Sequence, residues 1–241
     1  MKSKASHSFP LEHSLSLVVI FLLALCIAIE VMAVVLALSQ IPLLSKQVVT
    51  EADNATNDVI QAIPAIARLA AYLITGVLFL VWIYRVHKNL PALGVVRPRY
   101  SPGWAVGWFF VPFMNLVRPY EVVRELWKDS NPDVGLSDTF FKQHPQSIRH
   151  YPSRSRLIGL WWGCWIASLI AERASLMLLS GPEAATQAGT AMLAGIVSDC
   201  LGMIGVAIAI LIVREIDTRQ EEKHRRLIVD RGLQDQPAAA H

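Results

Sequence analysis

Four long apolar blocks constrain the fold of this chain more than any other feature. They cover residues 15–38, 66–84, 157–179 and 191–213, and each carries at most one charge or one adjacent acid–base pair. About 20 apolar residues, at about 1.5 Å each in a helix, cross a hydrocarbon core about 30 Å thick. The blocks therefore predict an all-α integral membrane protein with four transmembrane helices.

The overall composition supports a membrane protein over a soluble one. Of all residues 54% are hydrophobic and 17% are charged, whereas about a quarter of a typical soluble domain is charged. The alternative, four buried helices of a large soluble protein, is disfavoured because too few polar residues remain to cover them. The net charge of +3 is too small to indicate a nucleic-acid partner.

Basic residues are distributed unevenly around the four blocks. Of the 22 Lys and Arg, 11 lie in residues 85–156 and six in 214–241, whereas the connections 39–65 and 180–190 together hold one. Because Lys and Arg stay in the cytoplasm, we expect a multi-pass protein of the cell's inner membrane with residues 1–14, 85–156 and 214–241 inside and the two connections outside. The first block could belong to a signal peptide, but it is too long for one.

The stretch 82–127 alternates basic residues, Pro-Gly turns and aromatics. Its apolar run 104–117 reaches only about 21 Å as a helix and contains Pro112, so it favours a re-entrant, interfacial or packed helix over a full crossing. An amphipathic helix follows near 119–129. We expect this cytoplasmic-side module between the second and third spans to hold two helical pieces, broken between Pro112 and Arg118.

The flanks of this module have simpler predictions. Residues 129–156 are polar and contain three prolines, so we expect a loop. After the fourth span, the charged residues from 214 predict a cytoplasmic helix that ends before Gly232, followed by a disordered tail.

The motifs in the stretch 82–127 resemble a bacterial membrane-protein family catalogued as domain of unknown function 4328. The resemblance covers about residues 62–220 and also includes the run Val-Arg-Glu-Ile-Asp-Thr-Arg-Gln after the fourth span. It implies an integral membrane protein of uncharacterised activity, and it carries no catalytic residues to transfer. The signature residues are Asn89, Gly94, Arg99, Ser101, Pro102, Gly103, Trp104, Trp108, Pro112, Asn115, Arg118, Pro119, Tyr120 and Trp127.

Five ionisable residues interrupt the apolar blocks: Glu30, Arg68, Glu172, Arg173 and Asp199. By residue count the three acids lie about 10–12 Å below the outer boundary, with the two bases near them. Charged groups in a span are costly unless they are paired, so we expect each arginine to lie within ion-pair reach of an acid, leaving one acid over. We favour a structural salt-bridge network, and the alternative is a proton or cation site.

Signals of enzymatic chemistry are missing from the sequence. It contains no G-x-x-x-x-G-K-[ST], G-x-S-x-G or H-E-x-x-H pattern. The cysteines Cys26, Cys164 and Cys200 each lie inside a span and read as small apolar residues. We therefore expect no enzyme activity, no cofactor and no metal.

Two classes of function remain. The first is a non-enzymatic membrane module that binds lipid, including anionic lipid of the inner leaflet, or a protein partner through its basic and aromatic cytoplasmic face. The alternative is a small transporter or a proton- or cation-conducting protein that uses the intramembrane charges. Small residues recur every four positions in the third and fourth spans, which indicates close packing of these two helices or, alternatively, a homo-oligomer.

Overall fold

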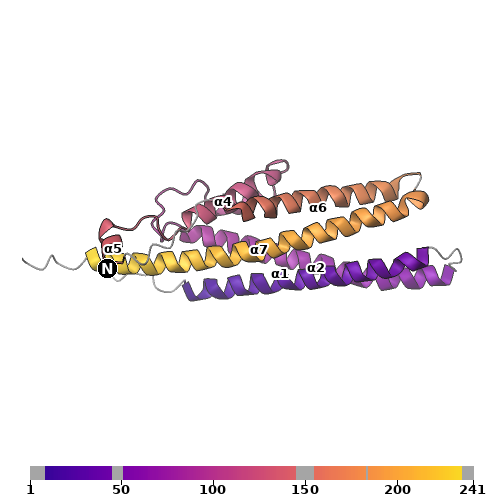
Figure 1. Cartoon of the computed structure of the whole chain (residues 1–241), viewed down its shortest axis with the longest axis horizontal. Helices are drawn as coiled ribbons and strands as arrows, with labels where there is room; N and C mark the ends of the chain where they lie inside the picture. Colours follow the sequence, from indigo (N-terminus) through magenta and orange to yellow (C-terminus); the bar gives the residue numbers. More distant parts are fainter. Residues whose placement is uncertain (1–8, 45–50, 145–154, 183, 235–241) are drawn as a thin grey trace, which may run out of the picture. The chain divides into compact units, whose positions relative to one another are not determined.

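The computed structural model describes residues 9–44, 51–144, 155–182 and 184–234. All regular structure within these ranges is helical, and Figure 1 shows the elements in chain order. The elements are α1 (Phe9–Leu44), α2 (Glu51–Asn89), α3 (Pro102–Gly107), the 3₁₀ helix η1 (Met114–Leu116), α4 (Arg118–Asp129), α5 (Asp138–Gln143), α6 (Arg156–Ser180) and α7 (Ala184–Gln234).

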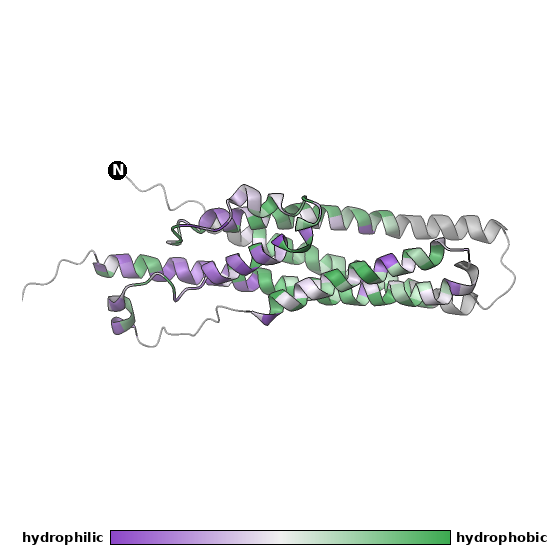
Figure 2. Cartoon of the chain, turned by 90° about the horizontal axis from the view of Figure 1, so that it is seen from above, coloured by the Kyte–Doolittle hydropathy of each residue, from purple (hydrophilic) through white to green (hydrophobic). Residues whose placement is uncertain are grey.

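Four of the helices are long and apolar enough to cross a membrane: α1, α2, α6 and α7. Each contains one of the four apolar blocks. In Figure 2 the hydropathy of α7 changes along its length, from mostly hydrophobic in its first half to mostly hydrophilic in its second. The predicted class, an all-α chain with four candidate membrane helices, therefore agrees with the structure.

The long helices extend further than the sequence predicted. Most of the connection 39–65 is helical, because α1 continues to Leu44 and α2 already begins at Glu51. Alanines at frequent intervals in this connection favour the helix. At the other end of the chain, α7 passes Gly232 and ends at Gln234.

The apolar run 104–117 is not one helix. The helix α3 ends at Gly107, turns follow, and η1 leads into α4 at Arg118. Pro112 lacks an N–H group and disfavours helix in the residue before it, and Phe113 has a φ of 61°, which few bulky residues adopt. The break between two helical pieces was predicted, but it begins earlier than expected.

A short helix lies in the region predicted as loop. It is α5, and the hydroxyl of Ser137 accepts a hydrogen bond of 3.2 Å from the backbone N–H of Phe140 at its start. This is the N-cap arrangement that serine favours. The Ser-Asp pair before two phenylalanines was therefore a usable helix signal.

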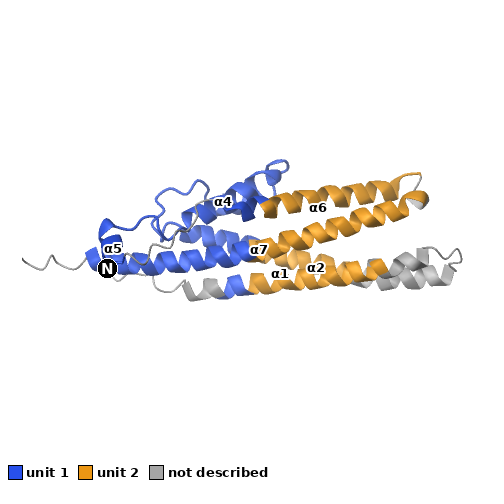
Figure 3. Ribbon diagram, viewed as in Figure 1, with its two compact units in different colours: residues 1–17, 80–159, 211–241 blue, residues 18–79, 160–210 orange. Residues whose placement is uncertain are grey.

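The chain divides into two compact units (Figure 3). Unit 1 comprises residues 1–17, 80–159 and 211–241, and unit 2 comprises residues 18–79 and 160–210. Helices α1, α2, α6 and α7 each contribute one part to unit 1 and another part to unit 2.

Unit 2 packs α6 closely against α7. The hydroxyl of Ser175 donates to the carbonyl oxygen of Ala191 at 2.8 Å. A Cβ atom added to Gly205 would lie 3.5 Å from the Cβ of Cys164. Small residues on both helices thus allow the backbones to approach, as expected for helix packing in membranes.

Unit 1 has an apolar core formed by the end of α2, the middle of α7 and α4. Leu90 closes the end of α2, and its exposure is nil. The buried apolar side chains of this core hold α4 against the two long helices. They are Trp82, Ile83, Leu90, Val122, Val123, Leu126, Val213 and Ile216.

Candidate functional site

The charged residues of unit 2 form a compact cluster around one arginine. The Nε atom of Arg68 lies 2.8 Å from Oε1 of Glu30, and its Nη2 atom lies 2.7 Å from Oδ1 of Asp199. Tyr72, one turn along α2 from Arg68, donates its hydroxyl to the same Oε1 of Glu30. We call Glu30, Arg68, Tyr72 and Asp199 the Arg68 cluster, and it ties α1, α2 and α7 together.

The Arg68 cluster holds two carboxylates for one guanidinium. Glu30 is only 2% exposed, and its second oxygen, Oε2, is buried without a hydrogen-bond partner in the described part of the chain. A buried carboxylate oxygen without a partner is unfavourable. This oxygen is the position in the cluster that a proton or a small cation would satisfy.

The other two predicted members, Glu172 and Arg173, do not join the cluster. Both side chains are exposed on α6. Among the residues that the structure describes, neither makes an ion pair. The expectation that Arg173 would reach Glu30 or Asp199 is therefore not met. The reason is the direction of its side chain. Ser168 marks the face of α6 towards α7, because its carbonyl oxygen accepts from the hydroxyl of Ser198. Arg173 lies about 140° away from Ser168 around α6.

The signature residues of the stretch 82–127 lie in unit 1, where several of them shape the backbone. Asn89 is the last residue of α2, and Gly94 follows with a φ of 81°, a conformation that glycine adopts at little cost. The hydroxyl of Ser101 accepts from the backbone N–H of Trp104 at 3.4 Å. Pro102 then supplies the first residue of α3, a favoured position for proline.

Two further signature residues, Arg99 and Arg118, form a polar network with Tyr100 and Glu121 at the start of α4. The carboxylate of Glu121 accepts from Arg118 at 2.6 Å and from the hydroxyl of Tyr100 at 2.7 Å. Arg99 approaches the same oxygen to 3.7 Å. The hydrogen bond from Tyr100 is the main cause that lowers the pKa of Glu121 below its ordinary value of 4.5. The adjacent residues Arg99 and Tyr100 therefore share one carboxylate with Arg118, which lies 18 residues after Tyr100.

The remaining signature residues include three tryptophans. The rings of Trp104 and Trp108 lie 5.0 Å apart, and the guanidinium of Arg118 lies 5.3 Å from the Trp108 ring. Trp127 is buried instead. The other five lie within the short helices or their connection: Gly103 in α3, Pro112 before η1, Asn115 in η1, and Pro119 and Tyr120 in α4.

The aromatic segment, which we define as residues 104–117, exposes large apolar side chains. Phe113 is 83% exposed and Phe110 is 71% exposed. Arginines with exposed side chains lie on both sides of the segment, among them Arg99 before it and Arg124 after it. The further exposed apolar residues of the segment are Trp104, Met114, Leu116 and Val117.

Sequence reasoning missed a stripe of buried polar residues on α7. Arg219 and Lys223 are 1% and 2% exposed, although both lie in a stretch that reads as a solvated charged helix. We call Arg219, Gln220, Lys223, Arg226 and Asp230 the α7 stripe. Its charged members recur at spacings of four, three and four residues, the period of one helix face, and this spacing is the signal that could have revealed the stripe.

The α7 stripe satisfies backbone groups at the ends of other helices. Arg219 donates to the carbonyl oxygen of Trp127 at 3.3 Å, and Lys223 donates to that of Asp129 at 2.7 Å, both in the last turn of α4. The last carbonyls of a helix lack partners within the helix, and they attract positive charge. The guanidinium of Arg219 also lies 4.0 Å from the ring centroid of Trp127.

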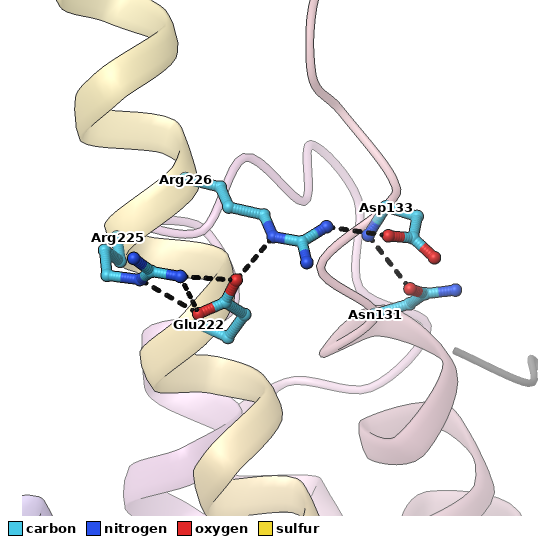
Figure 4. Close-up of polar contacts among 5 residues, drawn as sticks. All are labelled: Asn131, Asp133, Glu222, Arg225 and Arg226. Carbon is cyan, nitrogen blue, oxygen red and sulfur yellow. Dashed lines mark hydrogen bonds and ion pairs between the residues drawn. The ribbon is translucent and has the colours of Figure 1, made fainter. Parts of the chain in front are cut away.

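The end of the α7 stripe contacts the loop after α4 (Figure 4). Arg226 donates to Asp133 at 2.8 Å and to Glu222 at 2.7 Å. Glu222 also accepts from Arg225, and Asn131 accepts from the backbone N–H of Asp133 at 3.0 Å. The loop is thus held to α7 by one buried guanidinium that bridges two carboxylates.

One further buried residue of unit 1 was not singled out from the sequence. His87 has no exposed side-chain surface, and its Nε2 atom lies 3.8 Å from Oε2 of Glu125. Neither ring nitrogen has a hydrogen-bond partner among the described residues. His87 lies in the last turn of α2, where nothing in its neighbours distinguishes a buried histidine from an interfacial one.

The comparisons with known proteins agree with the sequence motifs. A family model described as a domain of unknown function, DUF4328, matches residues 45–218, which is 174 of the 241 residues. No curated protein and no solved structure matches the chain. The matched region contains the signature residues, the aromatic segment, and Arg68 and Asp199. The chain therefore belongs to the DUF4328 family, whose function is unknown.

Proposed function

We propose that this protein is a non-enzymatic, multi-pass module of a bacterial inner membrane that binds anionic lipid head groups on the cytoplasmic side. The observation that carries the proposal is the exposure of Phe110 and Phe113 at the turn of the aromatic segment. Soluble surfaces seldom expose several adjacent large apolar side chains. Aromatic side chains that flank membrane spans occupy the level of the head groups.

Basic residues near the aromatic segment supply the attraction to anionic lipid. Arg97, Arg124 and Lys128 are exposed, and Arg99 is more than half exposed. Each basic residue near an anionic surface contributes about 1 kcal/mol of attraction. Arg118 is engaged by Glu121, so it orients the segment and leaves the exposed bases to meet phosphate groups.

The first test measures whether the aromatic segment enters the bilayer. An environment-sensitive fluorophore is attached through Phe113→Cys in the full chain reconstituted into nanodiscs that contain phosphatidylglycerol. Its emission should shift to shorter wavelength because the tip of the segment leaves water. The control is Val134→Cys, which is exposed in the loop after α4 and should keep emission typical of water. Equal emission at the two positions would contradict the proposal.

The second test measures the preference for anionic lipid. In nanodiscs of mixed phosphatidylcholine and phosphatidylglycerol, the double variant Arg97→Gln/Arg99→Gln should lose the enrichment of phosphatidylglycerol around the protein. The control Arg225→Gln/Arg231→Gln removes the same charge from exposed positions of α7 and should retain it. An equal loss in both variants would indicate a general charge effect and no binding site.

A second candidate function is movement of protons or cations across the membrane. The buried and unpartnered Oε2 atom of Glu30 favours it, because an intramembrane acid without full pairing is a common feature of ion pathways. In liposomes loaded with a pH-sensitive dye, Glu30→Gln should abolish a proton flux if the Arg68 cluster conducts. The wild-type protein would then show a flux above that of empty liposomes, and its absence would reject this candidate.

A further inference from the structure

The two charged residues outside the Arg68 cluster lie in an exposed patch of α6. Glu172 and Arg173 are adjacent, so their side chains point about 100° apart around the helix and cannot readily pair with each other. Leu169 precedes them by one turn and Leu176 follows by one turn, and both are exposed. These four residues therefore form one continuous patch on the helix surface, with acid, base and leucine side by side.

The position of this patch along α6 makes its exposure costly. Glu172 lies eight residues before Ser180, the last residue of α6, or about 12 Å along the helix. If α6 crosses the membrane, both charges lie within or close to the hydrocarbon layer. Charged side chains in that layer almost always face protein or water and pair with each other. Lipid alone is thus an unsuitable cover for this surface.

The spacing of the patch matches the seam of a parallel two-stranded coil. Leu169 and Leu176 are seven residues apart, and Leu179, also exposed, comes three residues later. In heptad notation Leu169 and Leu176 occupy successive a positions, and Leu179 occupies the d position after Leu176. Glu172 occupies the d position after Leu169, and Arg173 follows it at e. Left-handed crossings of this kind are common between membrane helices.

We propose that α6 forms a two-fold symmetric interface with α6 of a second copy of this chain. All copies insert in one orientation, so Glu172 of one copy lies within one residue, about 1.5 Å along the helix, of the depth of the partner's Arg173. A two-fold axis brings residue i against residue j and residue j against residue i. Glu172 and the partner's Arg173 then pair, and the reverse pair forms on the other side of the axis, so that all four charges are neutralised.

A charge-exchange experiment tests this interface. The variant Glu172→Arg carries two bases in each copy and Arg173→Glu carries two acids, so neither should form a homodimer in nanodiscs. A mixture of the two variants should dimerise, because every acid then meets a base. The double exchange Glu172→Arg/Arg173→Glu should also dimerise with itself. The readout is energy transfer between fluorophores on C-terminal tags.

Energy transfer should be high for the wild type, fall to background in each single variant, and return in the mixture. Recovery in the mixture shows that the single variants are folded. A monomeric wild-type protein would overturn the proposal, as expected if lipid or a different protein covers α6. A dimer that persists in both single variants would overturn it as well, because the interface would then lie elsewhere.

Cross-linking locates the seam independently. In a chain with Cys26, Cys164 and Cys200 replaced by alanine, Leu176→Cys should form a disulfide between copies under mild oxidation. The control Met177→Cys is exposed one residue further and points about 100° away, so it should stay monomeric on a denaturing gel. Equal cross-linking at the two positions would contradict a defined seam.

Discussion

The Arg68 cluster and the α7 stripe both hold basic side chains against other helices, but they neutralise them in different ways. Arg68 lies between two carboxylates, Glu30 and Asp199, within 2.8 Å of each. In the α7 stripe, Arg219 and Lys223 donate to backbone carbonyls at the end of α4, and the one carboxylate that pairs with Arg219, that of Glu215, is 40% exposed. The first arrangement joins full charges in an apolar unit, and the second caps a helix.

This difference determines what each unit loses when its base is removed. Without Arg68, two acids that are 2% and 14% exposed lose the arginine that pairs with both of them. Without Arg219, a neutral carbonyl group and a tryptophan ring lose a contact, and the partly exposed Glu215 loses an ion pair. A stranded charge is far more unfavourable than a stranded carbonyl. The comparison thus predicts that removing Arg68 lowers the free energy of unfolding more than removing Arg219 does. Mutation can test this order.

The largest effect is expected from Arg68→Leu. It should lower the free energy of unfolding by about 3 to 5 kcal/mol, because an acid is left buried without its partner. Denaturation in mixed detergent and SDS micelles measures the change. The control Arg85→Leu makes the same substitution at an exposed position of α2 and should change stability little. A small loss for Arg68→Leu would mean that the acids are already neutral.

A smaller loss is expected from Arg219→Leu, about 1.5 to 3 kcal/mol, the usual contribution of a hydrogen bond to a charged group. The same unfolding assay applies. Arg225→Leu is the matched control on α7, since its guanidinium is 73% exposed and should contribute less than about 0.5 kcal/mol. A loss for Arg219→Leu that equals or exceeds that for Arg68→Leu would break the proposed order.

The smallest effect is expected at Glu121, a partly exposed carboxylate of unit 1. Hydrogen bonding by Tyr100 lowers its pKa, so ionised Glu121 stabilises the fold above pH 4.5, and this contribution is lost as the pH falls through its lowered pKa. The melting temperature of the wild type should therefore decrease on acidification more than that of Glu121→Gln.

The control for this pH dependence is Glu221→Gln, which removes an exposed acid of α7. Its melting temperature should follow that of the wild type across the acidic range. Parallel curves for the wild type and Glu121→Gln would show that the network of Tyr100, Arg118 and Glu121 contributes nothing that depends on ionisation.

The apolar blocks predicted the helices of the membrane part well, because hydropathy reports directly on length and depth. Depth alone also indicated that Glu30, Arg68 and Asp199 could meet. It did not indicate the angle around the helix, and for this reason Arg173 was misassigned. That angle depends on which face of α6 packs against α7, and small residues occur on more than one face of α6.

The polar parts of the chain were harder to predict for a different reason. In the apolar blocks a charge is rare and therefore informative, whereas in residues 214–234 charges are common and the buried ones do not stand out. Arg219 and Lys223 are residues of the same types as exposed neighbours such as Arg225. Only their helical spacing distinguishes them, and the carbonyl groups that they contact are invisible in a sequence.

The contacts of the α7 stripe join residues far apart in the sequence, and this has a consequence for the order in which the protein folds. Its hydrogen bonds to Trp127, Asp129 and Val86 join residues 92, 94 and 134 positions apart. Chains emerge from the ribosome with the N-terminal part first, and contacts between distant residues form late. The last turns of α2 and α4 therefore stay uncapped until the second half of α7 has been synthesised, so unit 1 completes its folding last.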